Sequence, residues 1–175
     1  MRVVDAKEIT RVVKGLCIKA NTVLRKDIVR AFEKACQEEA NPKARYVLDV
    51  LKKNARIAKG RRIPLCQDTG MAVVSVYLGQ EVKVKGNIES AIQRGVAAGY
   101  KQGNLRKSVV SDPFLRKNTH TNTPAIIYYY LTRGSKIKLV VCPKGFGSEN
   151  KSQTKMFLPT DSQSKVEEYI VDCVR

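Results

Sequence analysis

Residues 63–78 read IPLCQDTGMAVVSVYL, and two kinds of structure meet inside this stretch. Its first half, bounded by Pro64 and Gly70, is polar and irregular. Its second half, from Met71 to Leu78, is rich in β-branched residues, which is typical of a strand. The chain before the stretch has helical periodicity, whereas the chain after it mixes strands with helices. The sequence therefore predicts an α+β fold that changes character here.

Three helices are predicted in residues 1–60. Asp5 is a plausible N-cap of the first, the second runs from about Arg25 to about residue 40, and Pro42 suits the first turn of the third, which Gly60 closes. Each helix has an apolar stripe that needs a partner. The stripes could form a small bundle, and we expect them to form a helical layer packed on a sheet.

The rest of the sheet comes from two β-prone runs, Ala125–Leu131 and Lys136–Val141, which a turn at Gly134 separates. This pattern predicts an antiparallel hairpin. Residues 88–100 have helical spacing and predict a crossover helix, so we expect a mostly antiparallel sheet with one crossover. Residues 1–175 then form one domain, with a helical layer at 1–60, a sheet-containing part at 61–163 and a terminal helix at 164–175.

The composition is strongly basic, with 33 Lys and Arg against 16 Asp and Glu and a net charge of +17. Such a charge suggests nucleic acid as a partner. However, the basic residues are spread from Arg2 to Arg175, without a long tract or a known nucleic-acid-binding motif. A solvated surface, or a positive field that attracts a small dianion into a cleft, remains an equal explanation of the charge.

The sequence contains no apolar run near the roughly 20 residues of a membrane span and no pattern of a secretory signal. Its five cysteines are scattered, and none forms a C-x-x-C pair. We therefore expect a cytoplasmic protein with reduced thiols and no contact with a membrane.

Three loops contain residues whose types suit catalysis or ligand binding better than packing in a core. In Cys66–Gly70 a soft thiolate ligand precedes an amide, a carboxylate and a hydroxyl, so the thiolate could bind a metal or cluster while Asp68 transfers a proton. The alternative is a buried thiol in a turn that an Asx-type bond closes. Arg116–Pro124 holds the only histidine, His120, and Lys144–Asn150 offers two glycines whose amides suit an anion. Taken singly, either loop could be an ordinary turn.

In their order along the chain, these loops and an arginine loop at Arg106 resemble the class I fumarases and L(+)-tartrate dehydratases. The similarity covers essentially the whole chain. It is to the α-subunit, or to the N-terminal catalytic region of single-chain members.

This resemblance implies a hydro-lyase that adds water to fumarate or removes it from malate, with a [4Fe–4S] cluster whose open iron is a Lewis acid. By position, Cys66 resembles the first of three cluster cysteines. Gln67 and Asp68 resemble residues that contact the hydroxy-acid, with Asp68 as the acid–base participant. Arg106 resembles the arginine that grips a carboxylate, and Gly147 would line the same pocket.

Two departures from the family pattern bear on activity. The second and third cluster cysteines of the family follow a helix like 164–175, and the remaining cysteines here, Cys17, Cys36, Cys142 and Cys173, do not match them. We therefore expect a fragment or one piece of a split enzyme. His120-Thr121 stands where relatives carry Gly-Asp.

The partners that the resemblance implies are a small dicarboxylate or hydroxy-acid and a β-subunit or C-terminal domain, in an oligomer. An L(+)-tartrate dehydratase α-subunit is one alternative. A non-catalytic scaffold or a basic nucleic-acid-binding fragment is another.

Overall fold

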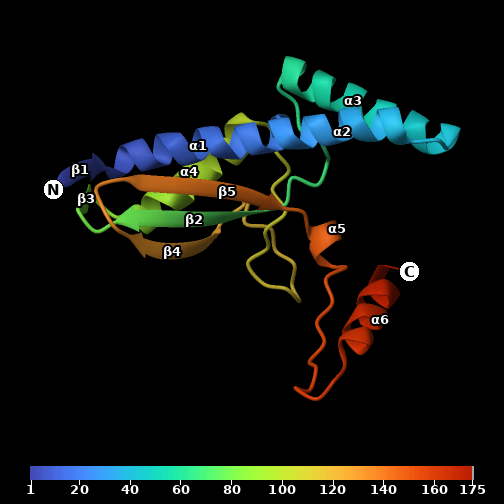
Figure 1. Ribbon diagram of the computed structural model, residues 1–175. Helices are drawn as coiled ribbons and strands as arrows, with labels where there is room; N and C mark the ends of the chain where they lie inside the picture. Colours follow the sequence, from blue (N-terminus) through green and yellow to red (C-terminus); the bar gives the residue numbers. More distant parts are fainter. Residues whose placement is uncertain (175) are drawn as a thin grey trace.

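The computed structural model describes residues 1–174 of the chain (Figure 1). Within them lie five strands, which are β1 Arg2–Asp5, β2 Met71–Gly79, β3 Val82–Lys85, β4 Ile126–Thr132 and β5 Ile137–Lys144. Six helices accompany them, which are α1 Ala6–Thr22, α2 Lys26–Glu38, α3 Pro42–Arg61, α4 Ile88–Gln102, α5 Phe146–Glu149 and α6 Gln163–Val174. The predicted α+β class is confirmed. None of the helices in this part of the chain combines the length and apolarity that a bilayer crossing demands.

The main sheet has the order β4-β2-β5, with β2 parallel to β4 and antiparallel to β5. The predicted hairpin between β4 and β5 is therefore wrong, because β2 lies between them. The physical reason is burial: Ala72, Val74 and Val76 on one face of β2 have no exposed surface, so this strand takes the centre. A second pair joins β1 and β3 in parallel, which makes the sheets mixed rather than mostly antiparallel.

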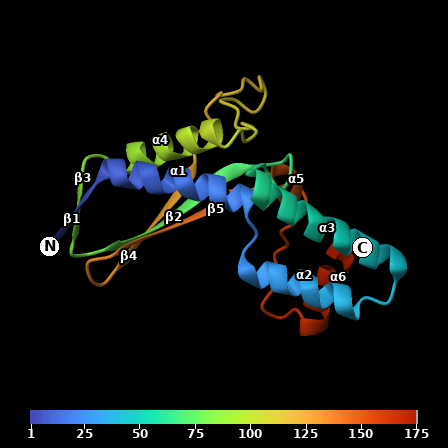
Figure 2. The same cartoon turned by 90° about the horizontal axis from the view of Figure 1, so that it is seen from above.

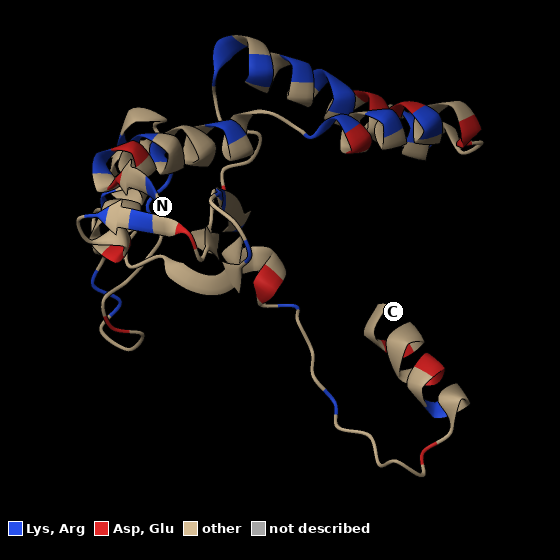
Figure 3. Cartoon of the chain, turned by 60° about the vertical axis from the view of Figure 1, so that its left-hand side comes forward, with Lys and Arg blue, Asp and Glu red and all other residues tan. Residues whose placement is uncertain are grey.

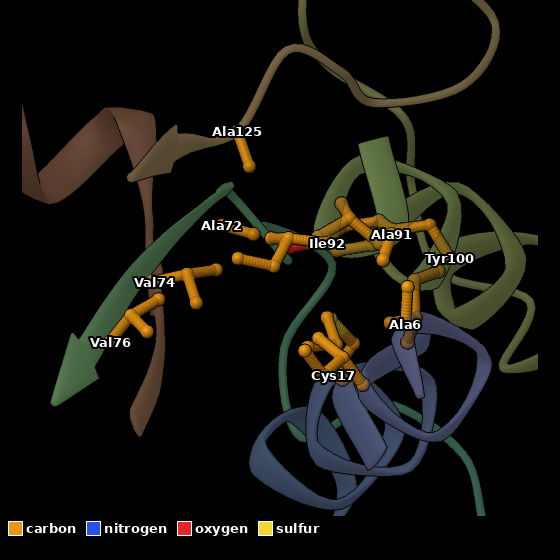
Figure 4. Packing of buried hydrophobic residues seen from close by; sticks show 13 residues of the cluster. Ala6, Cys17, Ala72, Val74, Val76, Ala91, Ile92, Tyr100 and Ala125 are labelled. Carbon is orange, nitrogen blue, oxygen red and sulfur yellow. The ribbon is translucent and has the colours of Figure 1, made fainter. Parts of the chain in front are cut away.

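The crossover helix is confirmed as α4, since parallel strands such as β2 and β4 need a long connection between them. Asn87 caps α4, and its side chain accepts the amide N–H of Ser90 at 2.8 Å. Helices α1 and α4 pack together and against β2. Figure 4 shows side chains from β2, α4 and α1 meeting in this core, among them Val74, Ile92 and Cys17.

The contact between α1 and α4 is close because α4 presents glycines to α1. A Cβ atom added at Gly95 would lie 2.8 Å from the Cβ of Val13, and one at Gly99 would lie 2.8 Å from the Cβ of Cys17. The hydroxyl of Thr10 donates across the same interface to the carbonyl of Ala91 at 2.9 Å. The backbones therefore approach at a distance that larger residues would prevent.

The predicted helical layer over residues 1–60 is only partly correct. Asp5 caps α1 and Pro42 begins α3 as expected, but α1 alone packs on the sheet. Helices α2 and α3 form a hairpin that extends away from it (Figure 2). No residue of α2 is buried, and Ala58 is the buried residue of α3. The apolar stripes of this hairpin are exposed, with Tyr46 at 71% and Val47 at 54%.

After β5 the chain leaves the sheet through α5 and an irregular segment to α6, which stands apart from the other elements (Figure 1). The predicted terminal helix at 164–175 is thus present as Gln163–Val174, and its last predicted residue, 175, is outside the described residues.

Replacing Gly95 with alanine will lower the free energy of unfolding by about 1–3 kcal/mol, because the new methyl group overpacks against Val13. The matched control is Gly15→Ala in α1, where a Cβ atom meets nothing within 4 Å. There the better helix propensity of alanine should raise the free energy of unfolding by up to about 1 kcal/mol. Urea denaturation measures both variants. Equal effects at the two glycines would contradict the close contact between α1 and α4.

Candidate active site

The loop that carries Cys66 is fixed to the helices before it. Helix α3 ends at Arg61, and the left-handed backbone of its C-cap residue Arg62 (φ 53°) turns the chain. The amide N–H of Leu65 then donates to the carbonyl of Asn21 at 2.8 Å, and the side chain of Asn54 donates to the carbonyl of Leu65 at 2.8 Å. The residue just before Cys66 is therefore held to both α1 and α3.

The other end of the loop enters the core, where its polar groups find buried partners. The phenol of Tyr100 donates to the carbonyl of Thr69 at 2.7 Å, and the hydroxyl of Thr69 donates to the carbonyl of Arg106 at 2.9 Å. Burial raises the pKa of Tyr100 above its ordinary range, so this phenol stays a donor. Gly70 has φ +61°, and a Cβ atom there would lie 2.2 Å from the carbonyl oxygen of Lys144. Only glycine fits this position.

The fully buried amide of Asn122 joins this loop to the next one along the chain. Its Nδ2 donates to the carbonyl of Gly70 at 2.9 Å, while its Oδ1 accepts the amides of Ser108 at 2.7 Å and Val109 at 3.1 Å. The backbone at Asn122 has φ 59°, a left-handed conformation that asparagine tolerates better than most residues. Sequence reasoning placed Asn122 in a polar turn but did not identify this role.

The carboxylate of Asp68 faces the glycine loop after β5. Its Oδ2 accepts the amide of Gly147 at 3.0 Å and its Oδ1 accepts the amide of Gly70 at 3.2 Å. These amides, helped by the positive charge of Arg106, hold the pKa of Asp68 below its ordinary value. A Cβ atom at Gly145 would lie 3.1 Å from Oδ2, so the small residue lets this loop approach. Asp68 is consequently ionised at neutral pH.

Cys66 is exposed beside this carboxylate. Its sulfur accepts the amide N–H of Asp68 at 3.4 Å, and its thiol lies 3.4 Å from the side-chain oxygen of Gln67. An exposed cysteine sulfur is a soft ligand that can bind a metal or an iron–sulfur cluster. By contrast, Cys17 is buried in the core, and burial raises the pKa of its thiol to about 12. Across residues 1–174, no three His, Cys, Asp or Glu side chains gather in a way that could hold a metal ion.

The structure thus brings together Cys66, Gln67, Asp68 and Gly147, and places Arg106 where its charge acts on Asp68. His120 is exposed in the polar loop, and its backbone amide donates to Asn118 at 2.7 Å. The anchors Tyr100 and Asn122 are the residues that the sequence pattern did not single out for this site.

Comparison with known proteins matches residues 10–175 to the family described as fumarate hydratase (Fumerase). A mitochondrial fumarate hydratase 1 of Leishmania major is 41% identical over 116 residues, 65% of this chain and 21% of that protein. A putative L(+)-tartrate dehydratase subunit alpha of Methanocaldococcus jannaschii is 30% identical over 174 residues, 95% of this chain and 61% of that protein. The aerobic class I fumarate hydratase of Escherichia coli (strain K12) is 36% identical over 143 residues, 78% of this chain and 26% of that protein.

The names of these relatives describe hydro-lyases, which are enzymes that add water to a substrate or remove it. The chain belongs to the fumarate hydratase (Fumerase) family, which confirms the resemblance predicted from the order of its motifs. It spans between about a fifth and three fifths of the length of the three relatives described above.

Replacing Asn122 with alanine will lower the free energy of unfolding by about 3 kcal/mol, because two buried amides and one buried carbonyl lose their partner. Asn104→Ala is the matched control, since Asn104 also has a positive φ (49°) but is exposed. Urea denaturation should separate the two variants by about 2 kcal/mol or more. Similar losses would mean that backbone strain, and not the buried amide, explains the effect.

The lowered pKa of Asp68 predicts a pH-dependent contribution to stability. The ionised carboxylate stabilises the folded chain above the unfolded-state pKa, about 4, and this contribution is lost as the pH falls through the lower folded-state pKa. The free energy of unfolding of the wild type should therefore exceed that of Asp68→Asn at pH 7. The difference should shrink below about pH 4. A difference that stays constant down to pH 2 would contradict this role of the charge.

Proposed function

We propose that this chain supplies one part of the active site of a hydro-lyase that reversibly hydrates fumarate to malate. The observation that carries the proposal is an exposed thiol, Cys66, whose sulfur accepts the backbone amide of the ionised Asp68, on a loop whose two ends are anchored. Family membership supports the same reaction class. An anchored loop holds reacting groups in a fixed geometry, which is a large part of enzymatic rate enhancement.

Asp68 has the properties of the acid–base group. A carboxylate has about four lone-pair sites, and the amides of Gly147 and Gly70 use one on each oxygen. The remaining sites can accept a proton from a substrate hydroxyl or a water molecule. The glycine loop keeps the carboxylate ionised and fixed until that proton arrives.

The neighbouring residues suit a dianionic substrate. Arg106 is exposed, and its guanidinium offers two parallel donors to a carboxylate. The exposed amide of Gln67 can bind a hydroxyl or a second carboxylate oxygen. Together they would orient a small hydroxy-acid so that its hydroxyl faces Asp68.

The family resemblance implies a [4Fe–4S] cluster, which when bound supplies a Lewis-acidic iron for the substrate hydroxyl. Cys66 has the exposure and the sulfur-directed amide of a cluster ligand. The described residues fit one ligand of such a cluster and not the three cysteines that it needs, since the other four cysteines lie elsewhere. We therefore propose that the other two ligands come from the region that follows a helix like 164–175 in the family. A β-subunit or C-terminal domain would complete the substrate-binding site, in an oligomeric enzyme.

A second candidate function is L(+)-tartrate dehydration. The tartrate dehydratase subunit alpha of Methanocaldococcus jannaschii aligns with 95% of this chain, whereas the Escherichia coli fumarate hydratase aligns with 78%. Both substrates are dicarboxylates that carry or gain a hydroxyl next to a carboxylate. The arrangement of Asp68, Arg106 and Gln67 is compatible with either one.

The test is anaerobic incubation of the chain with iron and sulfide, together with a polypeptide corresponding to the remaining region of its relatives. Cluster absorbance and hydration of fumarate should both appear, and Cys66→Ala should abolish both. Cys142→Ala, which changes an exposed thiol on β5, should leave both intact. Asp68→Asn should keep the absorbance and lower turnover about 10²–10⁴-fold.

Parallel assays with malate, fumarate and L(+)-tartrate distinguish the two candidate substrates. Full activity of Asp68→Asn would overturn its acid–base role. A cluster that forms equally well in Cys66→Ala would overturn the ligand assignment.

A further inference from the structure

A large groove lies outside the candidate active site, between the second half of α1 and the α2–α3 hairpin. Its volume is about 1030 Å³. Apolar side chains form much of its lining, among them Leu16, Val23, Leu24, Phe32 and Ala55. These five side chains are only half-buried, so the groove offers an apolar surface that no other element of residues 1–174 covers.

The side chains around this apolar surface are mostly basic. Seven Lys and Arg contact the groove and Glu33 is its single acidic residue. Of the seven, Arg25 is paired with Asp27 and Lys52 with Asp49. No ion pair within residues 1–174 involves Lys19, Arg56 or Lys59. Figure 3 shows Lys and Arg as blue bands along the α2–α3 hairpin, with fewer red bands of Asp and Glu between them.

The terminal helix α6 has the complementary chemistry. Its sequence, QSKVEEYIVDCV, contains three acidic residues and one lysine. Apolar residues recur at positions 166, 169, 170 and 174, the spacing of one helical face. The ring of Tyr169 already packs edge-on against Phe157 at 5.8 Å, whereas Ile170 is 57% and Val174 83% exposed. The second half of this apolar face is therefore uncovered.

We propose that the groove binds helix α6 of a second copy of this chain. Opposite charges and uncovered apolar faces match, and an amphipathic helix laid in an apolar groove is a common recognition mode. A twelve-residue helix is about 18 Å long and about 10 Å across, so its embedded half occupies about 700 Å³, less than the volume of the groove. The chain's own α6 stands away from α2 and α3 (Figures 1 and 3), which leaves the groove to another copy.

This pairing is independent of the proposed hydro-lyase activity. Two chains that exchange their α6 helices would bury both grooves at once and close into a symmetric dimer. Because the rim contacts are charged, the dimer should weaken as salt is raised.

Sedimentation of the chain of residues 1–175 tests the proposal. Arg56→Glu in the groove and Glu168→Lys in α6 should each raise the dimer dissociation constant at least tenfold. Lys53→Glu is the control, because Lys53 is an exposed α3 lysine that does not line the groove. It should leave dimerisation within about threefold of the wild type, a change well under 1.4 kcal/mol.

Mixing the two defective variants gives the decisive result. In the mixed dimer, the groove that carries Arg56→Glu meets the helix that carries Glu168→Lys, so their charges are again opposite. The unchanged groove meets the unchanged helix. Association should therefore return. Fluorescently labelled peptide of residues 160–174 should also bind the wild-type chain, and Arg56→Glu should weaken this binding at least tenfold. A chain that stays monomeric and does not bind the peptide would overturn the proposal. The proposal would also be overturned if the peptide-free contact recovered only when both changes were in one chain, because that result would mean that the groove binds the α6 helix of its own chain.

Discussion

Two buried carbonyl groups, those of Thr69 and Gly70, constrain most of this structure. They lie where the candidate active-site loop enters the core, before β2 begins, so no neighbouring strand can pair with them. Buried carbonyls without partners are costly. The phenol of Tyr100 and the amide of Asn122 meet this need, and both side chains are fully buried. Helix α4 and the polar loop at residue 122 are thereby tied to one point.

That point also determines the geometry around Asp68. With Gly70 held by Asn122, its own amide N–H is directed at Asp68, and its missing side chain lets the carbonyl of Lys144 come close. The glycine loop after β5 then lies beside the carboxylate and donates the amide of Gly147. A charged group is thus fixed by backbone amides, which cannot rotate away as side chains can. The candidate site is therefore held in place by hydrogen bonds in the core, made by residues that do not take part in the proposed reaction.

The sequence predicted where the helices and strands lie better than it predicted how they pair and pack. Helical spacing located α1 to α4 and α6, and β-branched runs located β2, β4 and β5. The pairing of β4 with β5 failed because a local turn signal at Gly134 says nothing about which strand is most apolar. The helical layer failed because apolar stripes on α2 and α3 indicate that these helices need a cover, but not what covers them. For the candidate site, motif order proposed Cys66, Gln67, Asp68, Arg106 and Gly147, and their roles stay predictions. The function of Asn122 depends on contacts between residues 14 and 52 positions apart in the chain, which no local pattern reveals.

The structure shows where part of the net charge of +17 is concentrated, which the composition alone does not. Seven of the 33 Lys and Arg contact one groove, where only one acidic side chain faces them. At the candidate active site, backbone amides, above all that of Gly147, stabilise the Asp68 carboxylate, and the positive charge of Arg106 adds a smaller contribution. A dianion entering there would otherwise meet the repulsion of an ionised aspartate, so a surplus of positive charge nearby favours its approach. Under the two proposals, part of the basic composition serves different needs: the groove would bind an acidic helix, and the candidate active site would bind an anionic substrate. Neither requires a nucleic acid.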